Sequence, residues 1–379
     1  LEESYISRPL PVLENLPAEN RIRMVDPSAN ENSENIFKSI DMALAQLRNG
    51  DVIQIKHDGE VVLQPTKMEK LSGEVIIRPA PGFKPILVAG PPQESGQYPL
   101  FELTEGTLKL EDLEIHLRPN ETRERTPTLA VLRKNGSIQL RSCNIQLEKG
   151  SSRNPPSLIS IGTSTELMAM DASTPKPPAG TSNILIDRCK IRGECNLFRN
   201  RTNRIADLQI TDSYLALVGV MAYLDPPAES SPQAGNFQLK LHHTSVATGG
   251  PCMLFKGIKP LTSPLGIRLQ ESIFAPAPGM PFMRFEGGET TEAKIPDMVR
   301  IDSVQNIFCA PASLMEWSEG GDTNLKTMNW NSWQENYQDS QSNNYDALTV
   351  FTNRESFWKS PWSQFKIASS PDIGPKSAE

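Results

Sequence analysis

A short phrase that recurs seven times constrains the fold of this chain more than any other feature. Each copy has an apolar-x-apolar triplet, then two polar residues, then a small residue and a further apolar position. The copies begin at Leu108, Ile138, Ile184, Leu208, Leu239, Ile267 and, with a slipped ending, Val299. Their third residues are Leu110, Leu140, Ile186, Ile210, Leu241, Leu269 and Ile301. A unit that recurs every few tens of residues is typical of a solenoid, and alternation with period two is typical of strands. The repeat therefore predicts a β-helix in which these residues point inward.

Separate apolar runs between the copies predict a third strand in each coil. The runs begin at Leu100, Leu129, Leu158, Asn196, Val220, Cys252, Pro281 and Leu314. They predict about eight coils of three strands each between residues 51 and 317. Segments 162–182, 225–235, 256–264 and 286–297 follow this third strand and are rich in Pro, Gly and Ser. Loops on a rigid scaffold are common binding sites, so these loops are expected to project from one corner of the solenoid.

The two ends of the chain differ from the repeats. Residues 1–32 are predicted to be a linker with one entry strand at 21–25, and residues 33–50 a capping helix that starts at Ser33. Such a helix would cover the open end of the first coil. Residues 318–379 are rich in aromatic side chains, and all five tryptophans lie between Trp317 and Trp362. This tail is interpreted as an aromatic C-terminal cap, with a sugar-stacking platform as the alternative.

Composition excludes some classes of partner. The net charge of −7 and the isoelectric point of about 5.4 argue against general nucleic-acid binding, which needs a basic surface. No apolar run approaches the roughly 20 residues of a membrane-spanning helix. The first residues are polar and interrupted by proline, unlike a signal peptide. The lack of an initiator Met indicates a processed chain or an excised segment of a larger protein. We expect an extracytoplasmic location.

The five cysteines form no CxxC pair. Cys143 and Cys189 occupy the same position of the repeat, which predicts that they are small, stacked interior residues. Cys189 and Cys195 lie six residues apart, so a disulfide between them is the alternative.

The stretch from Arg21 to Val62 resembles the entry segment of pectin-lyase-like right-handed parallel β-helices. In that family an amphipathic helix ends in Gly-Asp before an apolar strand, and residues 49–53, NGDVI, match this junction. The copy ILIDRCKI at Ile184 is similar to the family's strand, tight turn and strand. The chain looks most like the β-helix segments attached to some bacterial Ser/Thr kinases and envelope proteins. The resemblance implies a right-handed β-helix over residues 52–317, and either a binding module or an enzyme that cleaves acidic polysaccharides.

The sequence offers little support for catalysis. Glycosidases need two nearby carboxylates, but the third-strand runs contain only Glu102 and Glu316, at opposite ends of the stack. If the chain were a lyase, the resemblance would imply a calcium ion held by aspartates, with an Arg or Lys base. The closest match to such a set is Asp187, Arg188, Asp212, His242 and His243. These residues fall at the bend between the first two strands, where polar side chains usually satisfy the backbone of the turn.

The histidines at 242 and 243 are adjacent, and adjacent residues on a strand point to opposite faces. The sequence analysis therefore predicts neither a metal site nor any other cofactor.

Basic residues provide the candidate binding surface. The middle residues of the last three copies, Lys240, Arg268 and Arg300, are predicted to form an outward column in consecutive coils. Arg188, Lys190, Arg192, Arg199, Arg201 and Arg204 form a second basic group. An anionic glycan or a protein could bind either surface, while a solvated strand face balanced by Glu271 and Asp302 is the alternative. The sequence thus favours a non-catalytic binding or scaffold module, with a polysaccharide lyase or glycoside hydrolase as the alternative.

Overall fold

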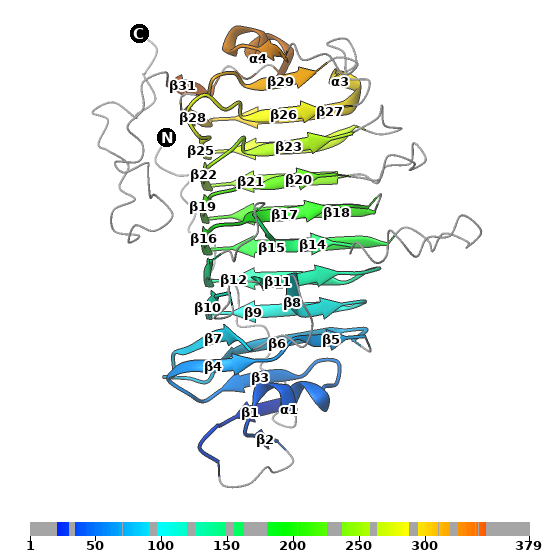
Figure 1. The fold of residues 1–379 in the computed structure, drawn as a ribbon, viewed down its shortest axis with the longest axis vertical. Coiled ribbons are helices and arrows are strands. Elements are labelled where there is room, and N and C mark those ends of the chain that lie inside the picture. Colours follow the sequence, from blue (N-terminus) through cyan, green and yellow to red (C-terminus); the bar gives the residue numbers. More distant parts are fainter. Residues whose placement is uncertain are drawn as a thin grey trace, which may run out of the picture.

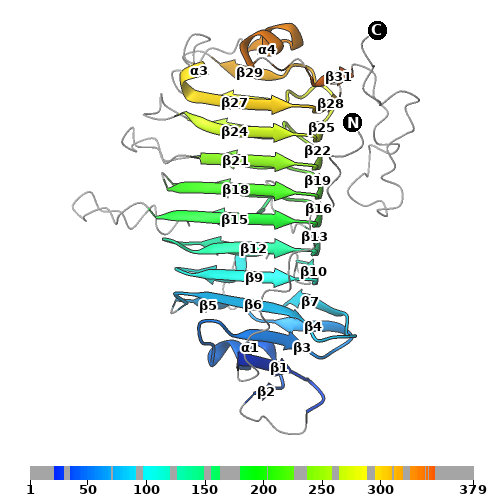
Figure 2. The same cartoon turned by 180° about the vertical axis from the view of Figure 1, so that it is seen from behind.

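The computed structural model is a right-handed parallel β-helix built from three long sheets. Figure 1 and Figure 2 show the stack of coils from opposite sides. The structure describes residues 21–29, 35–69, 71–90, 97–119, 126–148, 155–162, 180–202, 204–225, 237–257, 264–287, 295–309, 311–318, 325–337, 339 and 341–345. Most of the loops predicted to follow the third strand lie outside these residues. The predicted fold class is confirmed.

Each sheet takes one strand from every coil. Sheet A contains β1 (Ile22–Val25), β2 (Ile36–Phe37), β3 (Val52–Ile55), β6 (Glu74–Pro79), β9 (Thr107–Glu111), β12 (Ser137–Arg141), β15 (Thr181–Asp187), β18 (Ile205–Thr211), β21 (Phe237–His242), β24 (Leu265–Gln270) and β27 (Val299–Val304). Sheet B contains β4 (Gly59–Leu63), β7 (Pro85–Ala89), β10 (Glu114–Leu117), β13 (Asn144–Leu147), β16 (Lys190–Gly193), β19 (Tyr214–Leu217), β22 (Ser245–Thr248), β25 (Ile273–Ala275), β28 (Ile307–Cys309) and β31 (Asn343–Tyr345).

Sheet C contains β5 (Thr66–Met68), β8 (Gln97–Leu103), β11 (Thr126–Leu132), β14 (Ser157–Ile161), β17 (Asn196–Asn200), β20 (Ala222–Leu224), β23 (Met253–Lys256), β26 (Met283–Glu286), β29 (Met315–Ser318) and the antiparallel β30 (Leu325–Met328). The described strands form nine coils, from β3–β4–β5 to β27–β28–β29, rather than about eight. The extra coil is the first, whose third strand, TKM, is not an apolar run.

The repeat phrase supplies sheets A and B, and its third residue is buried in the common core. The pairing places Leu110, Leu140, Ile186, Ile210, Leu241 and Leu269 in one parallel column. All six are at most 1% exposed, as predicted. The last copy is an exception, because Ile301 pairs with Ile267 and Ser303 takes the place beside Leu269. The last copy, which is not part of the predicted column, is therefore shifted by two residues, and a shift of two residues changes the register but keeps the inward face.

A ladder of stacked, buried residues runs inside the bend between sheets A and B, and its members from Ser213 to Asn306 are polar. In each coil, the residue that directly precedes the ladder residue has a positive φ. These preceding residues are Asp112, Ser142, Arg188, Asp212, His243, Glu271 and Gln305. Such a conformation turns the chain sharply and leaves backbone groups that need partners. The side chain of a ladder residue accepts a hydrogen bond from the backbone amide of the ladder residue in the coil before it. Ser213 accepts from Cys189, Ser272 from Thr244, and Asn306 from Ser272. The bend is therefore a structural element that repeats with the coils.

Replacing Asn306 with alanine is expected to lower the free energy of unfolding by about 2–3 kcal/mol, because buried groups lose their partners. Its amide oxygen accepts from the Ser272 amide, and its nitrogen donates to the Leu269 carbonyl and the Ser303 hydroxyl. Denaturant unfolding measures the change. Asn306→Ser is the matched control, since serine serves at the equivalent position 272, and it should cost less. Equal stability of all three proteins would contradict the structural role of the ladder.

Short helices lie at both ends of the stack (Figure 1). At the N-terminal end, α1 (Ile40–Ala45) buries Ile40, Ala43 and Leu44 and starts at the N-cap Ser39. The prediction of a helix from Ser33 was wrong in extent, because Ile36 and Phe37 form β2, which pairs with β1. A short α3 (Ile295–Met298) precedes β27.

At the C-terminal end, α4 (Trp330–Tyr337) packs Trp333 against Phe282 and Phe308, with ring centroids 6.1 and 5.8 Å apart. Residues 346–379, including Trp358 and Trp362, lie outside the described residues. The described part of the tail thus contains the predicted aromatic cap.

The five cysteines are all buried and free. Cys143 and Cys189 stack as predicted, with the Cys143 amide donating to the Cys189 sulfur at 3.4 Å. Cys189 and Cys195 do not form the alternative disulfide. No helix in the described part of the chain has the length and apolar character needed to cross a membrane.

Candidate functional site

The five residues considered as a fallback catalytic set lie at the bend between sheets A and B, in three successive coils. Asp187 ends β15, and its carboxylate accepts from the Thr211 hydroxyl at 2.8 Å and from Arg188 at 3.0 Å. Asp212 and His243 occupy the positive-φ position of the next two coils. The side chains of Asp187, Asp212 and His243 contact other side chains of the bend. The interpretation that they satisfy the turn backbone was wrong, because the following residue of the coil, such as Ser213 or Ser272, accepts the backbone amide instead.

His242 and His243 lie on the same side of the molecule, and the prediction that they point to opposite faces was wrong. Alternation requires both residues to be on a strand, but His243 has a φ of 48° and belongs to the bend. The two rings stack with centroids 3.9 Å apart. His243 Nε2 contacts Glu271 Oε2 in the next coil, and His242 Nε2 lies 4.0 Å from the same oxygen. Burial raises the pKa of Glu271, but its bonds and attractions to His243 outweigh burial, so the net direction is downward.

The predicted basic column does not form as expected. Lys240 and Arg268 are in register, but Arg268 lies opposite Asp302, and Arg300 lies opposite Gly266. The reason is the two-residue shift of the last copy. Lys240 contacts Asp207 at 3.5 Å, and Arg268 contacts Asp302 at 2.9 Å, so both charges are partly neutralised. The structure therefore shows two paired cations on this face rather than a line of three.

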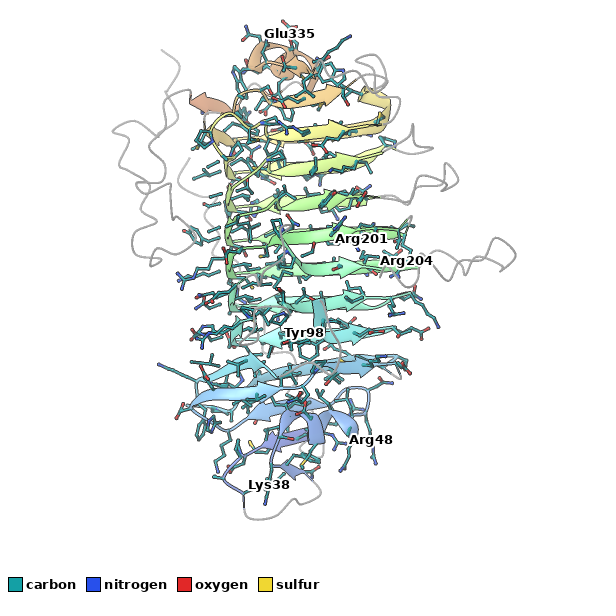
Figure 3. The ribbon with its side chains drawn as sticks, in the orientation of Figure 1. Lys38, Arg48, Tyr98, Arg201, Arg204 and Glu335 are labelled. Carbon is teal, nitrogen blue, oxygen red and sulfur yellow. The ribbon has the colours of Figure 1, made fainter. Side chains whose placement is uncertain are left out.

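The second basic group is spread around the coils, because its residues follow the chain through all three sheets. Lys190 and Arg192 are on β16 in sheet B, whereas Arg199 is on β17 in sheet C. Arg204 bonds the Lys134 carbonyl and the Ser182 hydroxyl, and it therefore ties neighbouring coils together. Arg199 lies on β17 and Arg201 directly follows this strand, whereas Arg204 lies farther toward the edge of the stack (Figure 3).

The outer side of sheet C carries a band of charged residues that we call the sheet C face. Its members are Glu102, Arg133, Arg199, Arg201, Tyr223, Asp225, Lys256, Arg284, Glu286 and Glu316. Four cations pair with acids from adjacent coils: Arg133 with Glu102, Arg199 with Asp225, Lys256 with Glu286, and Arg284 with Glu316. The Arg199 guanidinium also lies over the Tyr223 ring, 4.4 Å from its centroid. These contacts order the long side chains on a rigid sheet.

Arg201 differs from the other cations of this face. Among the described residues its guanidinium has no hydrogen-bonded or ion-pair partner. Burial lowers the pKa of Arg201, the like charge of Arg199 lowers it further, and Asp225 offsets part of this effect. The backbone at this position is held by an Asx turn, in which the Asn200 side chain accepts from both the amide and the hydroxyl of Thr202. A partly desolvated, preorganised guanidinium is suited to bind an anion.

Two carboxylates on the sheet C face were missed by the sequence analysis. Asp225 directly follows β20, and Glu286 ends β26, two coils further along the same column. Two coil spacings correspond to about 10 Å, at the upper end of the separation in inverting glycosidases. Both residues lie just beyond the apolar runs that marked the third strands, so a search of the runs alone did not include them.

Comparisons of the chain with protein-family models, with curated proteins and with solved structures find no match. The structure by itself supports a parallel β-helix.

Proposed function

We propose that the protein is a non-catalytic binding module that holds an anionic glycan on the sheet C face. The observation that carries this proposal is Arg201, a partly buried guanidinium with no ion pair or hydrogen bond to an acid among the described residues. Asp225 attracts it but is paired with Arg199. The four other cations of this face have partners, so Arg201 supplies the excess positive charge. A bound anion would stabilise the positive charge of Arg201, which partial burial has removed from water.

The shape of the face favours a linear polyanion over a single small ion. Charged side chains recur with the spacing of the coils, about 4.8 Å, along a straight sheet. Arg199 and Lys256 both lie against the Tyr223 ring, at 4.4 and 5.8 Å from its centroid. Their ion pairs with Asp225 and Glu286 can be exchanged for bonds to the acidic groups of a bound chain. The resemblance to pectin-lyase-like β-helices supports a polyuronate as the glycan and an extracytoplasmic part of a larger protein as the setting.

Asp225 and Glu286 favour the alternative function, a glycoside hydrolase or lyase. Each carboxylate is engaged by a neighbouring cation, Asp225 by Arg199 and Glu286 by Lys256. Either carboxylate would have to leave its cation before it could contact a glycosidic bond as a general acid or base. The pairing therefore favours binding without cleavage.

Titration with a size-fractionated oligogalacturonate tests the proposed binding. Arg201→Gln is expected to weaken binding at least tenfold, corresponding to about 1.4 kcal/mol. Arg268→Gln is the matched control, because that arginine is exposed on sheet A and bonds Asp302, and it should have little effect. The methyl-esterified oligomer keeps the sugar chain but lacks charge, so it should bind poorly. Higher salt should weaken binding to the acidic oligomer.

Equal losses for the two arginine variants, or equal binding of the esterified oligomer, would contradict the proposed site. The same incubations are assayed for new reducing ends and unsaturated uronides. Product formation that Asp225→Asn or Glu286→Gln abolishes would establish the enzymatic alternative instead.

A further inference from the structure

Three side chains with metal-ligating atoms meet at the bend between sheets A and B. His242 and His243 come from the coil that contains β21, and Glu271 comes from the next coil, which contains β24. One ligand atom from each of the three lies within 4.8 Å of the others. We propose that these residues bind a divalent transition-metal ion of the zinc class. This site is separate from the sheet C face, and the proposal does not depend on glycan binding.

Two neighbouring side chains orient the ligands. Asp212 Oδ1 lies 3.3 Å from His243 Nδ1, so a ring protonated at Nδ1 donates to Asp212 and turns the lone pair of Nε2 toward Glu271. Gln270 Nε2 donates to Glu271 Oε1 at 3.2 Å and leaves Oε2 directed at the histidines. A carboxylate behind a ligating histidine is the usual outer partner in zinc sites, where it fixes the tautomer and the ring orientation.

The backbone that carries the ligands is fixed before any metal binds. The amide of His243 donates to the Gln270 carbonyl at 3.2 Å, and the amide of Glu271 donates to the Val304 carbonyl at 3.1 Å. The coils themselves account for the positive φ of His243, because other coils have the same conformation with Asp112, Ser142 or Arg188 at this position. What is particular to this bend is its chemistry, since the described residues contain no other such group of three His, Cys, Asp or Glu side chains.

The ligand set decides which metal is suitable. Two imidazole nitrogens and one carboxylate oxygen suit zinc, nickel or copper, whereas calcium and magnesium prefer oxygen ligands alone. Three protein ligands leave a tetrahedral position open to water, and the half-exposed His243 gives the ion access from solvent.

Calorimetric titration of the tag-free, chelator-treated chain with Zn²⁺ tests the site. We expect one equivalent to bind, and His243→Asn and Glu271→Gln to weaken binding at least tenfold. Asparagine tolerates a positive φ, so the first variant preserves the bend. Asp212→Asn should weaken binding by roughly tenfold or more, as outer partners of ligating histidines do. Circular dichroism of each variant confirms that the β-helix is intact.

His116→Asn is the matched control, because His116 also contacts a glutamate, Glu114, at 2.8 Å but has no second histidine beside it. It should bind Zn²⁺ as the wild-type protein does. Absence of stoichiometric binding to the wild-type chain would overturn the proposal. Equal weakening by His116→Asn and His243→Asn would also overturn it, because it would show nonspecific binding to exposed histidines.

Discussion

Replacing Trp333 with alanine is expected to lower the stability of the C-terminal coils by about 3–5 kcal/mol, the usual cost of truncating a buried tryptophan. The indole is fully buried and contacts the rings of Phe282, Phe308 and Tyr337. Its Nε1 also donates to the Asp339 carboxylate at 3.1 Å. Truncation would expose the apolar end of the last coil and leave Asp339 with one partner fewer.

Hydrogen exchange measures this effect locally, because each coil of a solenoid contacts only its neighbours. Amides of β27, β28 and β29 should exchange faster in the variant, while those of β9 and β12 should change little. Trp330→Ala is the control, since Trp330 is only partly buried against the core. Equal acceleration by both variants would show that Trp333 is not the central residue of the cap.

Gly193→Ala is expected to destabilise the protein by at least about 3 kcal/mol, the sum of backbone strain and a close steric contact. Gly193 ends β16 with a φ of +148°, a conformation that residues with a side chain rarely adopt. An added Cβ would lie 2.0 Å from the Leu147 carbonyl oxygen of the preceding coil. Since this oxygen belongs to the backbone, the two coils would have to separate.

Gly59→Ala separates the two contributions. Gly59 also has a positive φ, +94°, but a Cβ there would meet no heavy atom within 4 Å. The control should therefore show the strain alone, roughly 1–3 kcal/mol. Thermal and denaturant unfolding of both variants provide the comparison. If Gly193→Ala costs no more than Gly59→Ala, the coils can adjust to the added methyl group and the close contact is unimportant.

The sequence by itself determined the architecture. The third residues from Leu110 to Leu269 pair in one buried column, and the apolar runs form the third sheet. The stacking of Cys143 and Cys189 was also predictable, because they occupy the same position of the repeat. These inferences succeeded because a solenoid brings equivalent positions of successive repeats together, so sequence spacing becomes spatial order.

Only the tertiary structure decided how polar side chains from different coils combine. The line through Lys240, Arg268 and Arg300 depended on a register that the last copy shifts by two residues. His242 and His243 meet Glu271 because a bend, not a strand, carries His243. Arg201 lacks an acidic partner among the described residues because Arg199 engages Asp225, although these side chains lie in different coils. The prediction of an apolar column stays correct when the assumed backbone path is slightly wrong. The prediction of a charged contact does not, because the contact depends on where the bend turns and on which charged neighbour is nearer.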